Sequence, residues 1–217
     1  MNRVLHFRQT NESKVYFSSD FHFFHNPKWA VPLWKSRGFN SAVEMTDGII
    51  ESINDTVRST DKLFFLGDFC LNTVKSQFEE LLSRINCQSI YCLYGNHNSC
   101  IWSNYEEQVY SQYGKKDIEI YPLYYRNLIY IGNYAEISVD GQYINIFHYP
   151  QYIFNHMKDS AWNLVGHSHG NCPFSQPSDT TSKVLDVGWD VFKKPVGMEE
   201  IRKIMNTKNV FKVDHHK

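Results

Sequence analysis

The sequence has no long hydrophobic run and few cysteines. No apolar stretch approaches the roughly 18 residues that a membrane-spanning helix needs, so we expect no membrane span. The five cysteines are odd in number and include no C-x-x-C pair, which favours free thiols in a reducing cytosol. The first residues lack the apolar core of a signal peptide. We therefore expect a cytoplasmic protein.

An excess of charge of one sign is also missing. The chain has 22 Lys and Arg against 23 Asp and Glu, and its longest basic runs are pairs such as Lys115-Lys116. A protein that follows a polyanion needs many basic contacts, so this composition indicates neither nucleic acid nor an anionic membrane as partner. Internal repeats, low-complexity stretches and linkers are absent too. With 217 residues and 42% hydrophobic content, we expect one globular domain over residues 1–217.

The first half alternates expected strands with expected helices. Buried strands are predicted at 14–19, 62–66 and 89–94. Between them, Ser41 and Glu44 form a capping box that begins a helix, and Thr73 can cap a second one. The apolar faces of these two helices are expected to carry Val43, Ile49, Ile50, Ile53 and Val57, and then Phe78, Leu81, Leu82 and Ile85. A further helix is expected from Cys100 to about residue 113. This alternation indicates a layered α/β fold.

The second half has a different pattern. Short strands are expected at 127–131, 134–139 and 142–147, and Asp140-Gly141 is typical of a tight hairpin turn between the last two. A strand at 183–187 and a helix near 198–205 follow. Helical signals are few between these strands, so we expect a more antiparallel sheet here.

Polar residues follow the expected strands where each one ends. In open α/β sheets, sites form at such strand ends. Five of the ten histidines are in this set, which consists of Asp20, His22, Asp68, Asn96, His97, His148, His167 and His169. Carboxylate, imidazole and amide groups in this number are too many for one tetrahedral zinc, and they suit two metal ions about 3.5–4 Å apart.

The order of these residues resembles the calcineurin-like metallophosphoesterases. Members of that family carry D-x-H, G-D, G-N-H, H and G-H-x-H in succession. The same pattern is present here as Asp20-Phe21-His22, Gly67-Asp68, Gly95-Asn96-His97, His148 and Gly166-His167-Ser168-His169. The D-x-H-F-x-H opening and the segment at 186–190 resemble the small bacterial and phage members.

The resemblance implies a fold and a set of ligands. The fold would be a four-layer αββα sandwich of two mixed β-sheets, with the metal site at the carboxyl ends of the strands. Asp20, His22 and His169 would hold one ion, Asn96, His148 and His167 the other, and Asp68 would bridge them. The cofactors would be two divalent transition-metal ions, with Mn first in order and Fe, Zn, Ni and Co admitted by the same ligands.

The resemblance also implies a reaction. A metal-bridging hydroxide would hydrolyse a phosphodiester or phosphomonoester, and His97 would be catalytic, facing the phosphate or the leaving group. Many relatives carry Asp or Glu where this chain has Asn98, which can orient His97 but supplies no charge. His25, Asn98 and Tyr149 are candidates for substrate binding, although His25 also fits an ordinary loop residue. Asp190 is expected either to hydrogen-bond a ligand imidazole or to occupy a turn.

Several functional alternatives stay open. The balanced charge favours a small, nucleotide-like phosphorylated substrate over long nucleic acid. A metal-dependent nuclease acting on DNA or RNA would need a basic groove beside the metals. A non-catalytic, metal-bound scaffold for a protein partner is a third reading, and such relatives usually lose ligands. Trp29, Trp34 and Trp102 could stack on a base or cover the core, and the loop at 29–40 fits a core covering slightly better than a lid.

Overall fold

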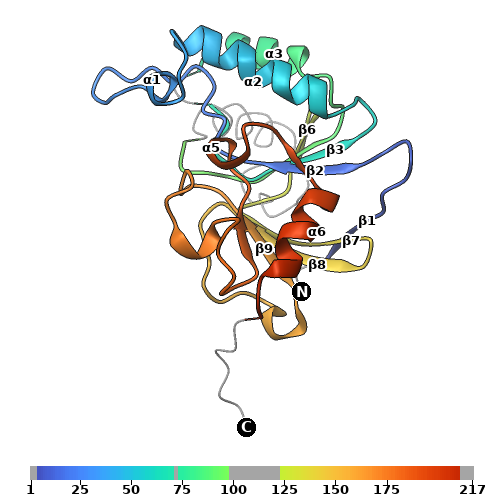
Figure 1. The fold of residues 1–217 in the computed structure, drawn as a ribbon. Coiled ribbons are helices and arrows are strands. Elements are labelled where there is room, and N and C mark those ends of the chain that lie inside the picture. Colours follow the sequence, from blue (N-terminus) through green and yellow to red (C-terminus); the bar gives the residue numbers. More distant parts are fainter. Residues whose placement is uncertain (1–3, 71–72, 98–122, 211–217) are drawn as a thin grey trace, which may run out of the picture.

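The computed structural model describes residues 4–70, 73–97 and 123–210, which form two β-sheets with helices around them (Figure 1). No helix in these ranges has both the length and the apolar character needed to cross a membrane. The strands are β1 (Leu5–Phe7), β2 (Val15–Ser18), β3 (Lys62–Phe65), β4 (Ile90–Cys92), β5 (Leu123–Tyr125), β6 (Leu128–Tyr130), β7 (Tyr134–Val139), β8 (Gln142–Phe147), β9 (Trp162–Val165), β10 (Val184–Asp186) and β11 (Val196–Gly197). The helices are α1 (Leu33–Ser36), α2 (Ala42–Thr56), α3 (Lys75–Arg84), α5 (Trp189–Phe192) and α6 (Met198–Thr207), with 3₁₀ turns η1 (Met157–Asp159) and η2 (Pro173–Ser175).

The two sheets are both mixed, as expected for the α/β class. One has the strand order β11-β2-β3-β4-β6-β5, and the other has the order β1-β7-β8-β9-β10. In the first sheet β2, β3, β4 and β6 run parallel to one another. This common direction brings the ends of β2, β3 and β4, and the polar residues that follow them, to one edge of the sheet.

The expectation of a more antiparallel second half is confirmed only in part. Every antiparallel pairing among the described strands involves a strand of the second half, as in β5–β6, β7–β8 and β11–β2, but the second sheet is largely parallel. In the second sheet only the hairpin of β7 and β8 is antiparallel among the described strands, and β1, β9 and β10 join by parallel pairings. The connections at 148–161 and 166–183 are long enough to return the chain to the same end of the sheet, as parallel pairing requires. The hairpin turn at Asp140-Gly141 is present as predicted, with φ of 50° and 83°.

The core lies in two main layers, because successive side chains along a strand point to opposite faces of its sheet. In β3, Phe64 points between the sheets and packs in one cluster with Phe17 and Leu164. Its neighbours Leu63 and Phe65 point the other way, into a cluster with α2 and α3, which cover the outer face of that sheet (Figure 1). The final helix, α6, adds Met198, Ile201 and Met205 to the cluster between the sheets.

The outer face of the second sheet carries a smaller apolar cluster. Val165 and Val184 of this face are buried with Phe154, Met157 and Ala161 from the connection before β9. A 3₁₀ turn and loops therefore cover this side of the described structure near β9 and β10. The two sheets lie face to face between this covering and the layer of α2 and α3.

Helix α2 begins where the capping box predicts. The Ser41 hydroxyl accepts a hydrogen bond from the amide of Glu44 at 3.0 Å, and the Glu44 carboxylate reaches the amide of Asn40 at 2.8 Å. Ile49 and Ile53 are fully buried as predicted. The prediction that Val43 belongs to the apolar face is wrong, because this residue lies in the first turn and is 59% exposed.

Helix α3 begins later than predicted, with Val74 and not Thr73 as its N-cap. The Gln77 side chain accepts from the Val74 amide at 3.3 Å and so takes over the capping role. Phe78, Leu81 and Leu82 form its buried face as expected. Strands β1, β5 and β11 were not predicted, and the helix expected after residue 100 lies outside the described residues.

Candidate metal centre

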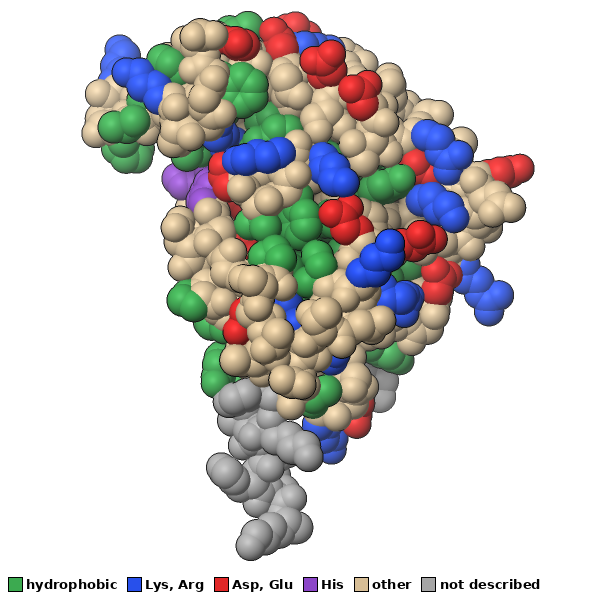
Figure 2. Space-filling view, viewed as in Figure 1, with side chains coloured by type: hydrophobic (Ala, Val, Ile, Leu, Met, Phe, Trp, Pro, Cys, Tyr) green, Lys and Arg blue, Asp and Glu red, His purple; other side chains and the backbone are tan. Residues whose placement is uncertain are grey.

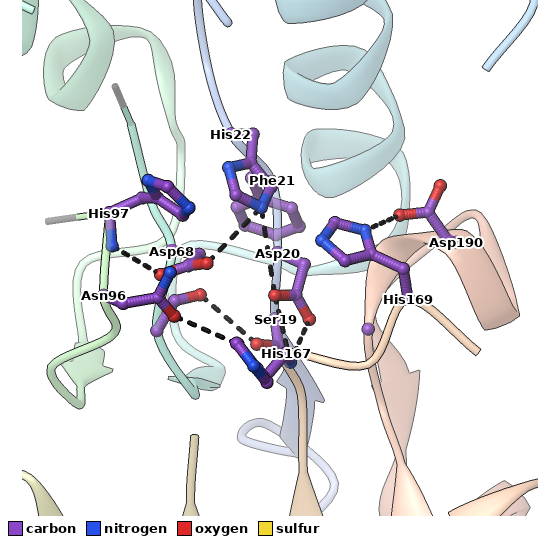
Figure 3. Close-up of polar contacts among 12 residues, drawn as sticks. Ser19, Asp20, Phe21, His22, Asp68, Asn96, His97, His167, His169 and Asp190 are labelled. Carbon is purple, nitrogen blue, oxygen red and sulfur yellow. Dashed lines mark hydrogen bonds and ion pairs between the residues drawn. The ribbon is translucent and has the colours of Figure 1, made fainter. Parts of the chain in front are cut away.

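Side chains from both sheets converge at the strand ends (Figure 3). They form two groups of closely spaced donor atoms, each able to hold a cation. One group contains Asp20, His22 and His169, and the other contains Asp68, His148 and His167. Within each group the donor atoms lie within 4.8 Å of one another. All of the strand-end residues predicted from the sequence therefore lie in or beside one region.

His22 is the residue of the first group whose surroundings point most directly to a cation. It is 2% exposed, and neither ring nitrogen has a hydrogen-bond partner among the described residues. Its Nε2 lies 3.5 Å from Asp68 Oδ2 and 4.0 Å from Asp20 Oδ1. Burial holds the pKa of His22 well below its usual value, which leaves the ring neutral. A buried, unpartnered imidazole beside two carboxylates is costly unless a cation lies between them.

His169 is oriented by a carboxylate. Its Nδ1 donates to Asp190 Oδ2 at 2.6 Å, which leaves the lone pair of Nε2 able to bind a metal ion. Burial opposes protonation, but this hydrogen bond and the nearby carboxylates raise the pKa of His169. Asp190 therefore hydrogen-bonds the imidazole of His169, a predicted ligand, which is one of the two roles that the sequence left open.

The second group brings lone pairs together around Asn96. His148 Nδ1 donates to the carbonyl of Leu66 at 2.8 Å, so its Nε2 carries a lone pair in the neutral ring. That Nε2 lies 3.0 Å from Asn96 Oδ1, and the same oxygen lies 3.0 Å from His167 Nδ1. Such a concentration of acceptors fits a divalent cation with imidazole and oxygen ligands. In the absence of a cation, Asp68 and Asp20 raise the pKa of His148 against the opposing effect of burial.

Asp68 belongs to the second group and also faces His22 of the first group. Its Oδ2 is 3.5 Å from His22 Nε2, and its Oδ1 is 3.4 Å from His148 Nε2. Burial opposes ionisation, yet the two imidazoles and the His97 amide, 2.8 Å away, lower the pKa of Asp68 to about 2. The neighbouring Asp20 behaves in the opposite way, since burial raises its pKa to about 7 despite His148 and His169. Asp68 is thus a permanent carboxylate that faces both groups.

The backbone at these positions is strained in the same way. Asp20, His22, Asp68, His167 and His169 all have φ between 49° and 66°, in the left-handed region. Each such residue costs about 1–2 kcal/mol, and clusters of this kind occur at functional sites.

Hydrogen bonds, and side chains packed directly against glycines, hold this backbone in place. The His167 amide donates to both oxygens of Asp20, at 3.1 and 3.0 Å. A Cβ on Gly166 would lie 2.7 Å from Asp20 Oδ2, and one on Gly67 would lie 2.6 Å from His148 Nδ1. These two motif glycines are therefore required by the side chains of Asp20 and His148, which pack against them.

Two further residues support the site and were not predicted as site residues. Asp186, at the end of β10, accepts from Ser168 Oγ at 2.6 Å and from the Gly170 amide at 3.0 Å, and so fixes the loop that carries both histidines. The sequence distinguishes its segment at 186–190 only through the family resemblance. Arg37 binds Asp190 and the backbone of the D-x-H segment. No sequence signal separates it from the other basic residues of its loop.

The candidates for substrate contact lie around the donor groups. His97 is half-buried, and its ring centroid is 5.3 Å from that of His22. Tyr149 is 40% exposed, with its ring centroid 4.6 Å from that of His167. His25 Nδ1 accepts from the Leu33 amide at 3.2 Å, and burial lowers the pKa of the ring. Asn98 lies outside the described residues.

The tryptophans of the loop divide between two roles. Trp34 packs against the core beside α2, while Trp29 is 78% exposed, so a core role for Trp29 is wrong. Trp102 lies outside the described residues. Cys70 and Cys172, which lie near the motifs, belong to neither donor group of the described chain.

The fold and the site together define a class: an α/β protein of two face-to-face mixed sheets, with two groups of donor atoms at the strand ends that could each hold a cation. The chain belongs to the calcineurin-like phosphoesterase family, whose model matches residues 13–203. An uncharacterized protein of Methanocaldococcus jannaschii is 26% identical over 198 residues, which cover 88% of this chain and 91% of that protein. The crystal structure of a protein of unknown function from Aquifex aeolicus has a TM-score of 0.52 at 18% identity, over 88% of this chain and 99% of the other.

Proposed function

We propose that this protein is a dinuclear-metal-dependent phosphoesterase that hydrolyses a nucleotide-like phosphodiester or phosphomonoester. The observation that carries the proposal is the position of Asp68, which faces His22 with one oxygen and His148 with the other. Asp20, His22 and His169 would hold one ion, and Asn96, His148 and His167 the other. Mn²⁺ comes first among the ions that these ligands accept, followed by Fe, Zn, Ni and Co.

Bound ions would supply a water of lowered pKa as nucleophile and would neutralise charge on the phosphoryl oxygens. The chain's own residues position the remaining chemistry. The His97 amide is fixed on Asp68, which keeps the ring at the rim of the site beside His22. From there the imidazole can reach the leaving oxygen or an equatorial oxygen of the phosphate.

Tyr149 supports a substrate with a planar ring next to its phosphate. Its ring lies against the imidazoles of His167 and His148, with centroids 4.6 and 5.0 Å away, and the residue is 40% exposed. The phosphate would bind at the donor groups, so an exposed aromatic ring beside them offers a stacking surface for a base. A phosphodiester of a nucleotide would place its base within reach of this ring.

The charge distribution favours a small substrate over a polymer. Lys and Arg side chains alternate with Asp and Glu over the face in Figure 2, and histidines reach the surface at its left edge, beneath the projecting segment around α1. A nuclease would need a basic groove that continues away from the metals. The interspersed charge of this face supports a nucleotide-sized substrate.

The test is hydrolysis of bis(p-nitrophenyl) phosphate and p-nitrophenyl phosphate after loading with Mn²⁺. We expect turnover, and we expect Asp68→Asn to lose nearly all of it because the shared carboxylate is gone. Asp47→Asn is the matched control, since it changes an exposed carboxylate that pairs with Arg84, and it should keep the wild-type rate. Intact metal binding without turnover for any of the five metals would instead favour the non-catalytic scaffold.

A second comparison separates the substrate classes. Tyr149→Ala should raise KM for a dinucleotide or cyclic nucleotide several-fold while it leaves the rate on glycerol phosphate, which has no planar ring, within about twofold. Tyr152→Ala, a change at another exposed tyrosine, is the control. Efficient cleavage of long single-stranded DNA or RNA in preference to nucleotides would favour the nuclease.

A further inference from the structure

Arg37 is buried beside the first donor group with every N–H group in use. Its side chain is 1% exposed. Nε donates to Asp190 Oδ1 at 2.9 Å, and Nη2 donates to Asp190 Oδ2 at 2.6 Å and to the carbonyl of Asp20 at 2.7 Å. Nη1 donates to the carbonyl of Phe21 at 2.8 Å and to Met45 Sδ at 3.7 Å. A guanidinium has five N–H donors, so none is left for a substrate.

The contacts of Arg37 join two segments that arrive from different sheets. The carbonyls of Asp20 and Phe21 belong to the D-x-H segment after β2, where Asp20 has a φ of 59°. Asp190 lies in α5, after β10 of the other sheet, and holds His169 by Nδ1 (Figure 3). One side chain therefore fixes both the backbone of one ligand and the partner of another.

The second donor group is held by other means. His148 is oriented by the carbonyl of Leu66, and Asn96 lies between His148 and His167. None of the hydrogen bonds of Arg37 goes to these residues in the described part of the chain. A loss of Arg37 should thus disturb the two groups unequally.

We propose that Arg37 is a positioning residue for one metal ion only, the ion held by Asp20, His22 and His169. This inference rests on the proposed function, since it assumes that the two donor groups hold ions. The planar shape of the guanidinium matters here as well as its charge. Nε and Nη2 donate two parallel hydrogen bonds to the Asp190 carboxylate, while Nη1 and Nη2 donate to the carbonyls of Phe21 and Asp20. A lysine ammonium keeps the charge but has three donors and no fixed plane, so it cannot make this set of bonds.

The experiment is Mn²⁺ titration of the metal-free protein by calorimetry, with electron paramagnetic resonance of the loaded protein. The wild type should bind two ions and show the spectrum of a coupled pair. Arg37→Lys should bind the ion of the first group about 10–100-fold more weakly, while the affinity for the other ion stays within about twofold. At one equivalent of Mn²⁺ the variant should show the signal of a single ion.

Two further variants keep the result interpretable. Arg84→Lys alters another Arg–Asp pair, whose atoms lie 2.6 Å apart but are exposed, and it should bind both ions normally. Arg37→Ala opens a cavity in which millimolar guanidinium should restore binding of the first ion, whereas methylammonium should not. Such rescue separates positioning from general loss of structure.

Each outcome decides the matter. Equal weakening of both ions, or wild-type affinity for both in Arg37→Lys, overturns the proposal. A wild type that binds two ions without hydrolysing any phosphoester overturns the proposed function and leaves the role of Arg37 standing. If Arg37→Lys does not fold, selective restoration by guanidinium in Arg37→Ala supports the proposal, and its failure overturns it.

Discussion

Gly166→Ala is the substitution that tests most sharply how tightly this site is built. The new Cβ would lie 2.6 Å from Ser19 Cβ and 2.7 Å from Asp20 Oδ2, whereas ordinary contact begins at 3.4 Å. Asp20 must therefore shift by about 0.7 Å, the difference between those two distances. Overpacking of this kind costs about 1–3 kcal/mol. For a chain of this size that corresponds to a fall in Tm of about 2–12 °C.

The displaced carboxylate should also weaken metal binding. A misplacement approaching 1 Å can cost a factor on the order of 100 in a site that depends on geometry, and we expect a loss of that order for the first ion. The assays are thermal unfolding without metal and calorimetric titration with Mn²⁺.

The control is Gly141→Ala in the hairpin turn. Gly141 has a φ of 83°, but a Cβ added there would meet no atom within 4 Å, so its substitution adds only backbone strain, about 1–2 kcal/mol, far from the metals. It should lower Tm by a similar amount and leave both affinities unchanged. Wild-type metal affinity in Gly166→Ala would refute the argument that close approach to Asp20 requires glycine.

Three other predictions follow from the same site. His97→Ala should keep both ions but slow hydrolysis roughly 10²–10⁴-fold, and loss of metal from this variant would show that His97 is a ligand. Mn²⁺ at 100 times its Kd should stabilise the protein by about 2.7 kcal/mol per ion and raise Tm by about 5–10 °C, whereas a chelator that leaves Tm unchanged in purified, metal-loaded protein would contradict the site. In the metal-free protein Asp20 has a pKa of about 7 when folded and near 3.8 when unfolded, so the folded state binds the extra proton and stability should fall as pH rises from about 4 to 7. Unfolding in denaturant across this range, compared with Asp20→Asn, checks that slope, which the variant should lack.

The alternation of strands and helices in the first half and the convergence of the motif residues were accessible from the sequence. Each expected ligand follows an apolar run, and parallel strands bring such positions to one edge of a sheet, so local patterns were sufficient for Asp20, Asp68 and His148. The pairing of β1 with β7 was not accessible in this way. Three residues near the N-terminus pair with Ile137, Ser138 and Val139, and no local signal marks a partner so distant in the chain.

Arg37 was missed for a related reason. It follows Asp20 by 17 residues and precedes Asp190 by 153, and its loop has no periodicity from which the direction of one side chain could be inferred. The left-handed backbone at Asp20, His22 and His169 was hidden as well, because only glycine adopts it freely, and Asp and His, although enriched there among the other residues, adopt negative φ at most positions. Sequence patterns thus indicated the candidate ligands but not the framework that holds them.

The candidate ligands come from two different sheets, which has a consequence for the stability and abundance of the protein. An ion held by both Asp20 and His169 would join positions about 150 residues apart and would act as a reversible cross-link. In the chain-entropy treatment of disulfides, closing a loop of that length is worth on the order of 5 kcal/mol. Metal starvation would then expose the chain to unfolding and proteolysis as well as silence it, so its abundance would follow the supply of its cofactor.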